Sequence, residues 1–303
     1  MRFTTIGAAI VDIVVSRVRP MLGAKQDVDH IGLYAGGGAV NAALNVAGRG
    51  AEVTVHACVG RDLEGGLVRD LLQRHGVRAV IPDHALPTGK AVVMVDDKGA
   101  ARAYAQRGAS AWVGEKGFAD LERSDVVYVT GLSLKSQDWL VQALTARLSA
   151  GFKLVVTPGA RQLSHPQALH DLWDRADLMC VNAFEAARLC DESLSDGDAV
   201  SPQAAGSLAQ RLTHRPGQCV LVTLGAAGAV FYDGAQAHFQ AARPVSAVST
   251  IGAGDAFASA FTHAWASGAA PQDALAAATD SAAQVVQVIP ANMAGPLRPF
   301  QQN

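Results

Sequence analysis

Residues Ser249–Phe261 read STIGAGDAFASAF, small residues that run into an aspartate and then into a segment with helical spacing. A turn built from Gly252, Ala253 and Gly254 leaves its backbone N–H groups uncovered at the positive end of the following helix, which suits an anion. Asp255 would then lie within reach of a hydroxyl that attacks a phosphoryl group in the turn, where it can act as general base. The simpler interpretation is that Asp255 only caps its helix. The two roles are compatible, and we expect Asp255 both to cap the helix and to serve as base.

Around this turn, short runs rich in β-branched residues alternate with longer Ala- and Leu-rich runs, which is typical of strands alternating with helices. The strands predicted are Phe3–Val11, Val53–Val59, Val126–Thr130, Leu154–Thr157, Leu178–Val181, Val220–Thr223, Ala229–Tyr232 and Pro244–Val248. The helices predicted are Val40–Arg49, Leu63–His75, Ser136–Ala150, Pro166–Arg175, Phe184–Cys190, Pro202–Leu212 and one from Asp255 to about Ser267. This alternation predicts an α/β fold, a three-layer αβα sandwich around a mostly parallel central sheet.

Two segments interrupt the alternation. Gln26–Tyr34 and Lys90–Tyr104 have strand-like alternation with no helix between, and the second turns at Asp97–Gly99 as a hairpin. We expect them to form a small β-sheet that projects from the main body as a lid and closes over a site.

The composition excludes several classes of function. The chain has 303 residues and a formal net charge of −2, so it lacks the basic surface that nucleic acid or an anionic membrane requires. The four cysteines form no CxxC pair, which favours free thiols in a reducing compartment. Asp12 interrupts the apolar N-terminal run, so a signal peptide is not predicted, and no apolar stretch is long enough to cross a bilayer. We therefore expect a cytoplasmic protein without a membrane partner.

The N-terminal half offers a candidate site for a polyhydroxylated ligand. Gly36, Gly37 and Gly38 precede a predicted helix with Asn41 on its first turn, and an Asn amide both donates and accepts hydrogen bonds. Asp12 ends an apolar strand, where ligands bind in parallel α/β sheets. A tight turn with a surface Asn, and an Asp that caps a turn, are the alternatives.

Two further elements suit phosphates or a metal ion. Asn182 and Glu185 follow a strand at a spacing that fits water and Mg²⁺ coordination, or simply a capping box. Thr223, Gly225 and Gly228 lie on a strand–turn–strand segment whose small residues let phosphates or a flat ring approach the backbone, although a plain hairpin has the same pattern.

The order of these motifs resembles the ribokinase-like sugar kinases, the PfkB carbohydrate kinases, from end to end. The two stretches of this sequence that carry the resemblance most specifically are GGGAVNAALNVAGRGAEVTVHACVGRDLEGG from Gly36 and STIGAGDAFASAF from Ser249. The resemblance implies one domain over residues 1–303, with lid segments at about 13–34 and 88–107. It implies transfer of a phosphoryl group from ATP to a sugar hydroxyl, with Mg²⁺ as cofactor and, in some relatives, a homodimer formed through the lid.

The resemblance also implies roles for individual residues. Asp255 is similar to the family's general base, and Gly252, Ala253 and Gly254 to its anion hole. The positions that match the sugar site are Asp12, Gly37, Gly38 and Asn41. Asn182, Thr223, Gly225 and Gly228 match the nucleotide site, and Glu185 matches the residue that helps to hold Mg²⁺.

The chain departs from the family pattern in ways that leave cation and nucleotide preference open. Ser249 stands where the family usually has an Asp that supports a monovalent cation, so potassium activation is open. The common Asp-x-Asn-x-Arg segment keeps only Arg161, and Thr279–Gln284 lacks an Asn that often lies beside the adenine.

Alternative functions differ in class. A Rossmann oxidoreductase and a P-loop kinase are excluded because their glycine motifs are missing. A nucleoside kinase of the same fold, with Tyr34 and Tyr104 as a shelf for the base, and an inactive sugar or nucleotide sensor are the remaining alternatives. A phosphosugar substrate would need lid arginines, for which Arg17, Arg19, Arg102 and Arg107 are the candidates; solvated strand residues are the plainer interpretation. A free sugar is the substrate we expect.

Overall fold

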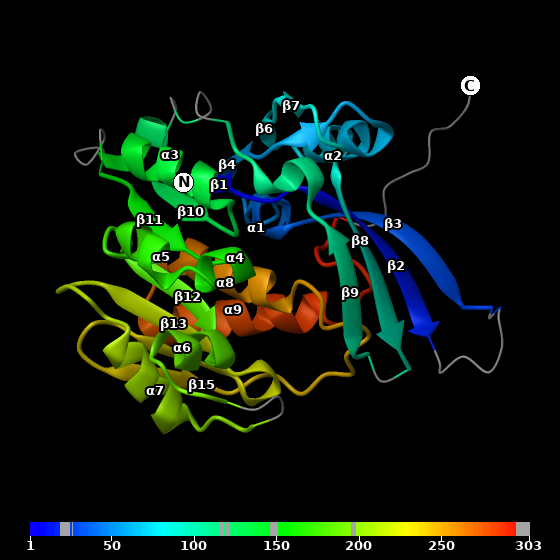
Figure 1. Cartoon of the computed structure of the whole chain (residues 1–303). Helices are drawn as coiled ribbons and strands as arrows, with labels where there is room; N and C mark the ends of the chain where they lie inside the picture. Colours follow the sequence, from blue (N-terminus) through cyan, green and yellow to red (C-terminus); the bar gives the residue numbers. More distant parts are fainter. Residues whose placement is uncertain are drawn as a thin grey trace.

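The computed structural model describes residues 1–18, 25, 27–97, 99–114, 118, 121–145, 151–194 and 198–294. Within them, nine strands form one sheet in the order β15-β14-β13-β12-β11-β10-β1-β4-β6 (Figure 1). These strands are β1 (Arg2–Ile6), β4 (Glu52–His56), β6 (Arg78–Val80), β10 (Val126–Val129), β11 (Lys153–Val156), β12 (Leu178–Asn182), β13 (Cys219–Thr223), β14 (Ala229–Tyr232) and β15 (Ala237–Gln240). All pairs from β6 to β13 are parallel and only β14 and β15 are antiparallel, which confirms the mostly parallel sheet.

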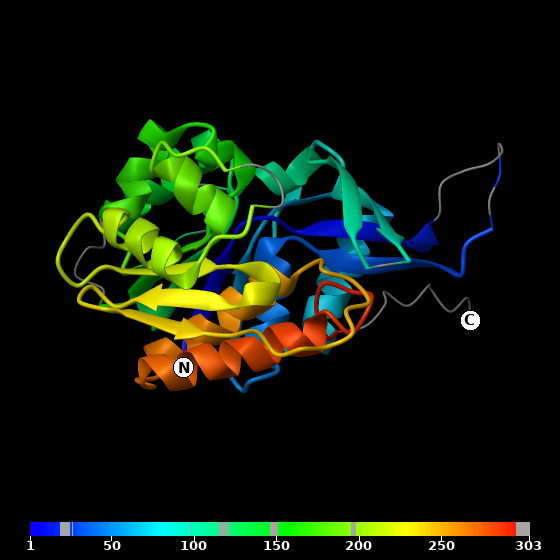
Figure 2. The same cartoon turned by 90° about the horizontal axis from the view of Figure 1, so that it is seen from below.

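Helices cover both faces of this sheet, as Figure 2 shows from below. They are α1 (Gly38–Ala47), α2 (Leu63–Arg74), α3 (Leu134–Thr145), α4 (Ala160–Leu163), α5 (Pro166–Trp173), α6 (Ala183–Leu189), α7 (Pro202–Arg211), α8 (Ala253–Ala266) and α9 (Pro271–Val285). Two separate cores result, one with α1, α2, α8 and α9 and the other with α3 and α5 to α7. The predicted three-layer sandwich is confirmed.

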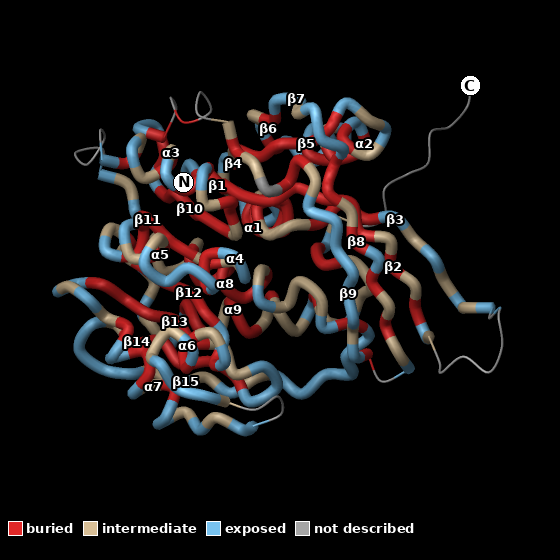
Figure 3. Tube along the Cα trace, in the orientation of Figure 1, coloured by how far each residue is buried: buried red, intermediate tan, exposed pale blue. Residues whose placement is uncertain are grey.

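The strand sequences explain the two cores, because successive side chains of a strand point to opposite faces. In β10, Val126 and Tyr128 lie in the first core, whereas Val127 and Val129 lie in the second. Each such apolar side chain contributes about 1.5–3 kcal/mol by leaving water. Figure 3 shows the central strands buried along most of their length.

A second sheet of four strands has the order β3-β2-β8-β9 and projects from one side of the main body (Figure 1). Its strands are β2 (Ile10–Val18), β3 (His30–Gly36), β8 (Gly89–Asp96) and β9 (Ala101–Gln106). Ile10, Val14, Tyr34 and Val93 form a core on its inner face, against which Ile251 and Ile289 pack. We call this element the small sheet. β3 agrees with the end of the predicted segment Gln26–Tyr34, and β8 with β9 forms the predicted hairpin, whereas β2 belongs to neither segment. Gln26 and Lys98 lie outside the described residues.

Three predicted strands are wrong. Val53–Val59 is not one strand, because β4 ends at His56 and Val59 begins β5 (Val59–Gly60), which pairs with β7 (Asp83–His84) in a separate two-stranded sheet. Phe3–Val11 is not one strand: the chain leaves the central sheet after Ile6, turns at Gly7 with φ 148° and enters the small sheet at Ile10. The continuous apolar sequence concealed this change of sheet, because residues on both strands are buried. Pro244–Val248 forms no strand; this segment is largely exposed and irregular. The end of the predicted helix Ser136–Ala150 lies outside the described residues.

Among the helices in the described part of the chain, none is both long enough and apolar enough to cross a membrane.

Candidate active site

A cleft of about 510 Å³ lies at the carboxyl ends of the parallel strands. This is the edge at which ligands bind in open α/β sheets. The predicted site residues that line it are Gly37, Gly38, Asn182, Glu185, Thr223, Gly254 and Asp255. The cleft therefore brings together residues from the beginning, middle and end of the chain.

The turn before α8 has the geometry of an anion site. Gly252 has φ 75°, a conformation that favours glycine, and an added Cβ would lie 2.2 Å from the Ala291 carbonyl oxygen. At Gly254 an added Cβ would meet nothing within 4 Å, because this residue opens onto the cleft. The first N–H groups of α8 have no acceptor within the helix, so they are available to an anion.

Asp255 does not cap its helix, so that interpretation is wrong. Gly252 occupies the N-cap position, and Asp255 lies in the first turn of α8. Its side-chain Oδ2 accepts a hydrogen bond of 2.8 Å from Nδ2 of Asn41, on the first turn of α1. Burial raises the pKa of Asp255, and the hydrogen bond from Asn41 opposes that rise. A carboxylate whose pKa is raised in this way is a stronger base than a solvated one.

Asp12 is a second carboxyl group whose charge interacts with that of Asp255, and unlike Asp255 it is buried. It lies on the inner face of the small sheet, opposite Tyr34, and only 6% of its surface is exposed. Gly36 makes room for it, since a Cβ there would lie 1.9 Å from Asp12 Oδ2. Burial, and then the charge of Asp255, raise the pKa of Asp12 to about 7. The two carboxyl groups therefore influence each other.

Replacing Asp12 with Asn is expected to stabilise the protein at high pH. Because the native pKa is raised to about 7, native Asp12 keeps its proton where the unfolded chain has lost it. The free energy of unfolding of the wild type therefore falls as the pH rises from about 4 to about 7. Asp12→Asn has no carboxyl group at this position and does not lose this stability. The difference in free energy of unfolding between the variant and the wild type therefore grows from near zero at about pH 4 to at most about 4 kcal/mol above about pH 7.

Urea denaturation of both proteins at about pH 4 and about pH 8 measures this difference. Asp138→Asn, at an exposed residue of α3, is the control for the chemical change alone. An equal pH dependence in wild type and Asp12→Asn would contradict the burial of a costly charge.

Asn182 and Glu185 form the capping box of α6. The Asn182 backbone N–H donates to Glu185 Oε2 at 2.9 Å, and the Glu185 N–H donates to Asn182 Oδ1 at 2.9 Å. Both residues also line the cleft, so capping and ligand contact are compatible. Burial raises the pKa of Glu185. A carboxylate and an amide oxygen in a cleft are ligand types that suit Mg²⁺ with part of its water shell.

The other predicted site residues differ in whether they line the cleft. Thr223 lines it from the end of β13, whereas Gly225 and Gly228 belong to the connection to β14, which is the hairpin foreseen as an alternative. Asp12, Asn41, Gly252 and Ala253 are not among the described residues that line the cleft.

The candidate arginines differ in whether they line the cleft. Arg107 lines the cleft, Arg17 pairs with Asp29 at 3.0 Å, and Arg102 is exposed on β9. Arg19 lies outside the described residues. Arg161, the one residue kept from the Asp-x-Asn-x-Arg segment, also lines the cleft.

Sequence reasoning missed several lining residues. Thr130 and Thr157 lie just after β10 and β11 and line the cleft. Their position after buried strands was a usable signal, since strand carboxyl ends carry the site. Asn292, which contacts Asn41 from near the C-terminus, had no such signal.

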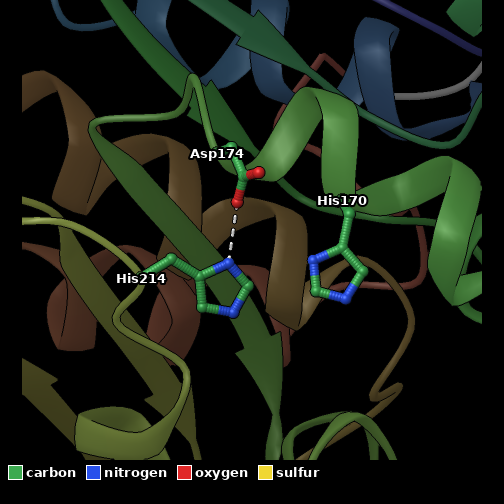
Figure 4. Close-up of side chains that lie close together, drawn as sticks. All are labelled: His170, Asp174 and His214. Carbon is green, nitrogen blue, oxygen red and sulfur yellow. Dashed lines mark hydrogen bonds and ion pairs between the residues drawn. The ribbon is translucent and has the colours of Figure 1, made fainter.

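A second group, shown in Figure 4, consists of side chains of types that bind metal ions, but its residues are not among those that line the cleft. His170, Asp174 and His214 offer ligand atoms within 4.8 Å of one another. His214 Nδ1 and Asp174 Oδ1 already hydrogen-bond at 2.8 Å, and the His214 ring stacks on Trp173. Arg215 donates to the Asp174 carbonyl oxygen at 3.0 Å, and its positive charge disfavours a cation nearby. These contacts account for the group as packing between α5 and the loop after α7.

Comparisons with known proteins show the family and the fold of this chain. A family model described as pfkB family carbohydrate kinase matches residues 2–294. Fructoselysine 6-kinase of Escherichia coli (strain K12) is 43% identical over 68 residues, 22% of this chain and 26% of that protein, so the match spans about a quarter of that relative. Ribokinase of Mus musculus is 28% identical over 234 residues, 74% of this chain and 69% of that protein.

Solved structures share the fold at low sequence identity. Adenosine kinase from Sinorhizobium meliloti has a TM-score of 0.76 and 21% identity, covering 97% of this chain and 96% of that one. Ribokinase from Cryptococcus neoformans var. grubii serotype A, in complex with ADP, has a TM-score of 0.77 and 22% identity, covering 95% and 93%. The ribokinase-like fold is thereby confirmed. Because the family model covers nearly the whole chain, the protein belongs to the pfkB family of carbohydrate kinases.

Proposed function

We propose that this protein transfers the γ-phosphoryl group of ATP to a hydroxyl group of a small sugar bound in the cleft. The observation that carries the proposal is the half-buried carboxylate of Asp255, which accepts a hydrogen bond from Asn41 and lies in the first turn of a helix that opens onto the cleft. Simple binding of a sugar or nucleotide does not require a base at an anion site, which favours an enzyme over a sensor.

In the proposed reaction, Asp255 takes the proton of the sugar hydroxyl while its oxygen attacks the γ-phosphorus. The new O–P bond forms as the bond from the γ-phosphorus to the bridging oxygen breaks, and ADP leaves with that electron pair. The backbone N–H groups of Gly252, Ala253 and Gly254 stabilise the negative charge on the transferring group. Asp12, Gly37, Gly38 and Asn41 hold the sugar.

A second set of residues, which follow β12 and β13, is proposed to bind the nucleotide. Asn182, Thr223, Gly225 and Gly228 are the proposed contacts of the nucleotide, and Glu185 would hold Mg²⁺, directly or through a water molecule. That ion, when bound, neutralises charge on the phosphate oxygens. Arg161 lines the same cleft and supplies a positive charge for a phosphate.

The small sheet is the proposed lid, and residues 1–303 the single domain from which it projects. Its inner face packs on Ile251, beside the anion turn, and carries Asp12. Closure of this sheet over the sugar would exclude water, which competes with the sugar as phosphoryl acceptor.

The geometry favours a free sugar over a nucleoside. Tyr34 is buried, and its hydroxyl hydrogen-bonds to His30 Nε2 at 2.8 Å, so its ring is not an open shelf. Tyr104 pairs with the exposed Val92 and is itself 66% exposed, on the outer face of the small sheet. Neither ring is placed for a nucleobase in the cleft.

The proposal is tested by ADP release from MgATP with a panel of pentoses, hexoses and nucleosides. Because Arg107 lines the cleft, the panel includes sugars that carry an anionic group. We expect turnover with a sugar and identification of its phosphate ester by mass spectrometry. Turnover with nucleosides alone would support the nucleoside kinase, and saturable ligand binding without turnover would support the sensor.

We further propose that the outer face of the small sheet pairs with a second copy of the chain. Leu33, Val92 and Tyr104 lie in register with Ile13 across all four strands and are exposed. Contiguous exposed apolar residues of this kind mark interaction sites. We expect Leu33→Lys to convert a dimer to a monomer in size-exclusion chromatography with light scattering. Leu86→Lys, at an exposed leucine outside this sheet, is the control, and a monomeric wild type would refute the proposal.

A further inference from the structure

Asn292 connects the C-terminal segment to the proposed base through a continuous chain of hydrogen bonds. Its Nδ2 donates to Asn41 Oδ1 at 2.9 Å, and Asn41 Nδ2 donates to Asp255 Oδ2 at 2.8 Å. Asn292 is only 1% exposed and Asn41 only 4% exposed. Such a buried chain does not exchange its partners with water.

The direction of every bond in this chain is fixed by backbone groups. Asn292 Nδ2 also donates to the Ala35 carbonyl oxygen at 2.9 Å, and Asn292 Oδ1 accepts from the Ala294 N–H at 3.1 Å. A carbonyl oxygen can only accept and a backbone N–H can only donate, so the Asn292 amide has one allowed orientation. Asn41 must then offer its oxygen to Asn292 and its NH₂ group to Asp255.

The same segment also supports the anion turn. The Ala291 carbonyl oxygen lies where a side chain of Gly252 would otherwise be, since an added Cβ would approach it to 2.2 Å. Residues 291 and 292 therefore contact both the turn that receives the anion and the amide that directs the base. Two independent contacts connect this segment to the site.

We infer that Asn292 is a positioning residue, which holds the Asn41 amide so that its NH₂ group faces Asp255 and keeps the carboxylate ionised and directed toward the acceptor hydroxyl. The inference rests on the proposed function for the acceptor. The orientation of Asp255 itself depends only on the hydrogen bonds. If Asn41 turned over, its oxygen would face the carboxylate, a repulsive contact that favours the protonated, inactive form of the base.

Other titratable groups act on Asp255 from the elements around it. Asp12 of β2 and Glu185 of α6 each have a pKa that the charge of Asp255 raises, and the same holds for Tyr128 of β10. Two neighbouring carboxyl groups thus oppose ionisation of Asp255, whereas the donor from Asn41 favours it. Loss of the Asn41 amide would therefore leave the pKa of Asp255 higher, because this hydrogen bond is what opposes the effect of burial.

The test is Asn292→Leu, which removes the donor at similar volume and adds no charge. A ¹³C NMR titration of the side-chain carboxyl groups, with Asp255→Asn to assign the signal, should show the pKa of Asp255 moved upward. The acidic limb of the kcat/KM profile should move the same way, with kcat roughly tenfold lower and KM for ATP unchanged. Asn292→Ala also removes the donor, with the same expected shift, and serves if the leucine variant does not fold.

Matched variants separate this role from a structural one. Asn45→Leu changes another buried amide on α1, one turn beyond Asn41, whose Nδ2 has no partner among the described residues; it should leave the pKa of Asp255 unchanged. Adding Asn292→Leu to Asn41→Leu should move that pKa no further than Asn41→Leu alone. An unchanged titration in Asn292→Leu overturns the inference, even if the enzyme is an active kinase. A shifted titration in a protein without kinase activity supports the inference and refutes the proposed function alone.

Discussion

Asp255→Asn is expected to lower kcat by about 10²- to 10⁴-fold, the usual contribution of a general base. The amide cannot accept the proton of the sugar hydroxyl, but its oxygen can still accept the hydrogen bond from Asn41. The fold and the affinity for ATP should therefore remain close to those of the wild type. Steady-state kinetics with the best acceptor, together with thermal unfolding, measures both effects.

Asp273→Asn is the matched control for this substitution. Asp273 lies in the first turn of α9, as Asp255 lies in the first turn of α8, but it is exposed and outside the lining of the cleft. The control removes the same favourable charge from a helix N-terminus, which costs about 0.3–1 kcal/mol, and should leave kcat unchanged. A similar, small effect of both substitutions on kcat would show that Asp255 is not the base.

The second large effect is expected for Gly254→Val. An added Cβ at Gly254 meets no atom within 4 Å, so the fold accommodates the side chain, yet that open space is the cleft itself. The methyl groups would occupy the position proposed for the transferring phosphoryl group and keep it from the backbone N–H groups. We expect kcat to fall by about 10²- to 10³-fold, the usual cost of losing one preorganised donor.

Gly66→Val provides the comparison for a valine in a helix. Gly66 lies in α2, and an added Cβ there also meets no atom within 4 Å. Both valine variants should keep their free energy of unfolding within about 1 kcal/mol of the wild type, because valine and glycine differ little in helix propensity. Full activity of Gly254→Val would mean that the phosphoryl group does not bind at this turn.

Much of the fold was predictable because its signals are local. Strands such as Val220–Thr223 carry continuous apolar residues since both faces of the parallel sheet are buried, and the helices between them show their period. The change of sheet between Ile6 and Ile10 was not predictable from hydrophobicity, because residues on both sides of it are buried. Only Gly7, with its positive φ, marks that point.

The candidate site was predictable where glycine or a strand end signals it. The turn at Gly252–Gly254 and the helix start at Gly37 need conformations that favour glycine, so both appear as clusters in the sequence. The capping role of Asp255 was wrong because the cap depends on φ at Gly252, which composition does not reveal. The contact of Asn292 with Asn41 joins residues 251 positions apart, and no local pattern encodes it.

The most direct test of the central claim is a single-turnover experiment with enzyme in excess over radiolabelled ATP and the best sugar acceptor. The account predicts rapid formation of sugar phosphate by the wild type and a chemical step slowed by about 10²- to 10⁴-fold in Asp255→Asn, with ATP binding retained. Formation of sugar phosphate by Asp255→Asn at the wild-type rate would contradict the assignment of the base and the mechanism built on it.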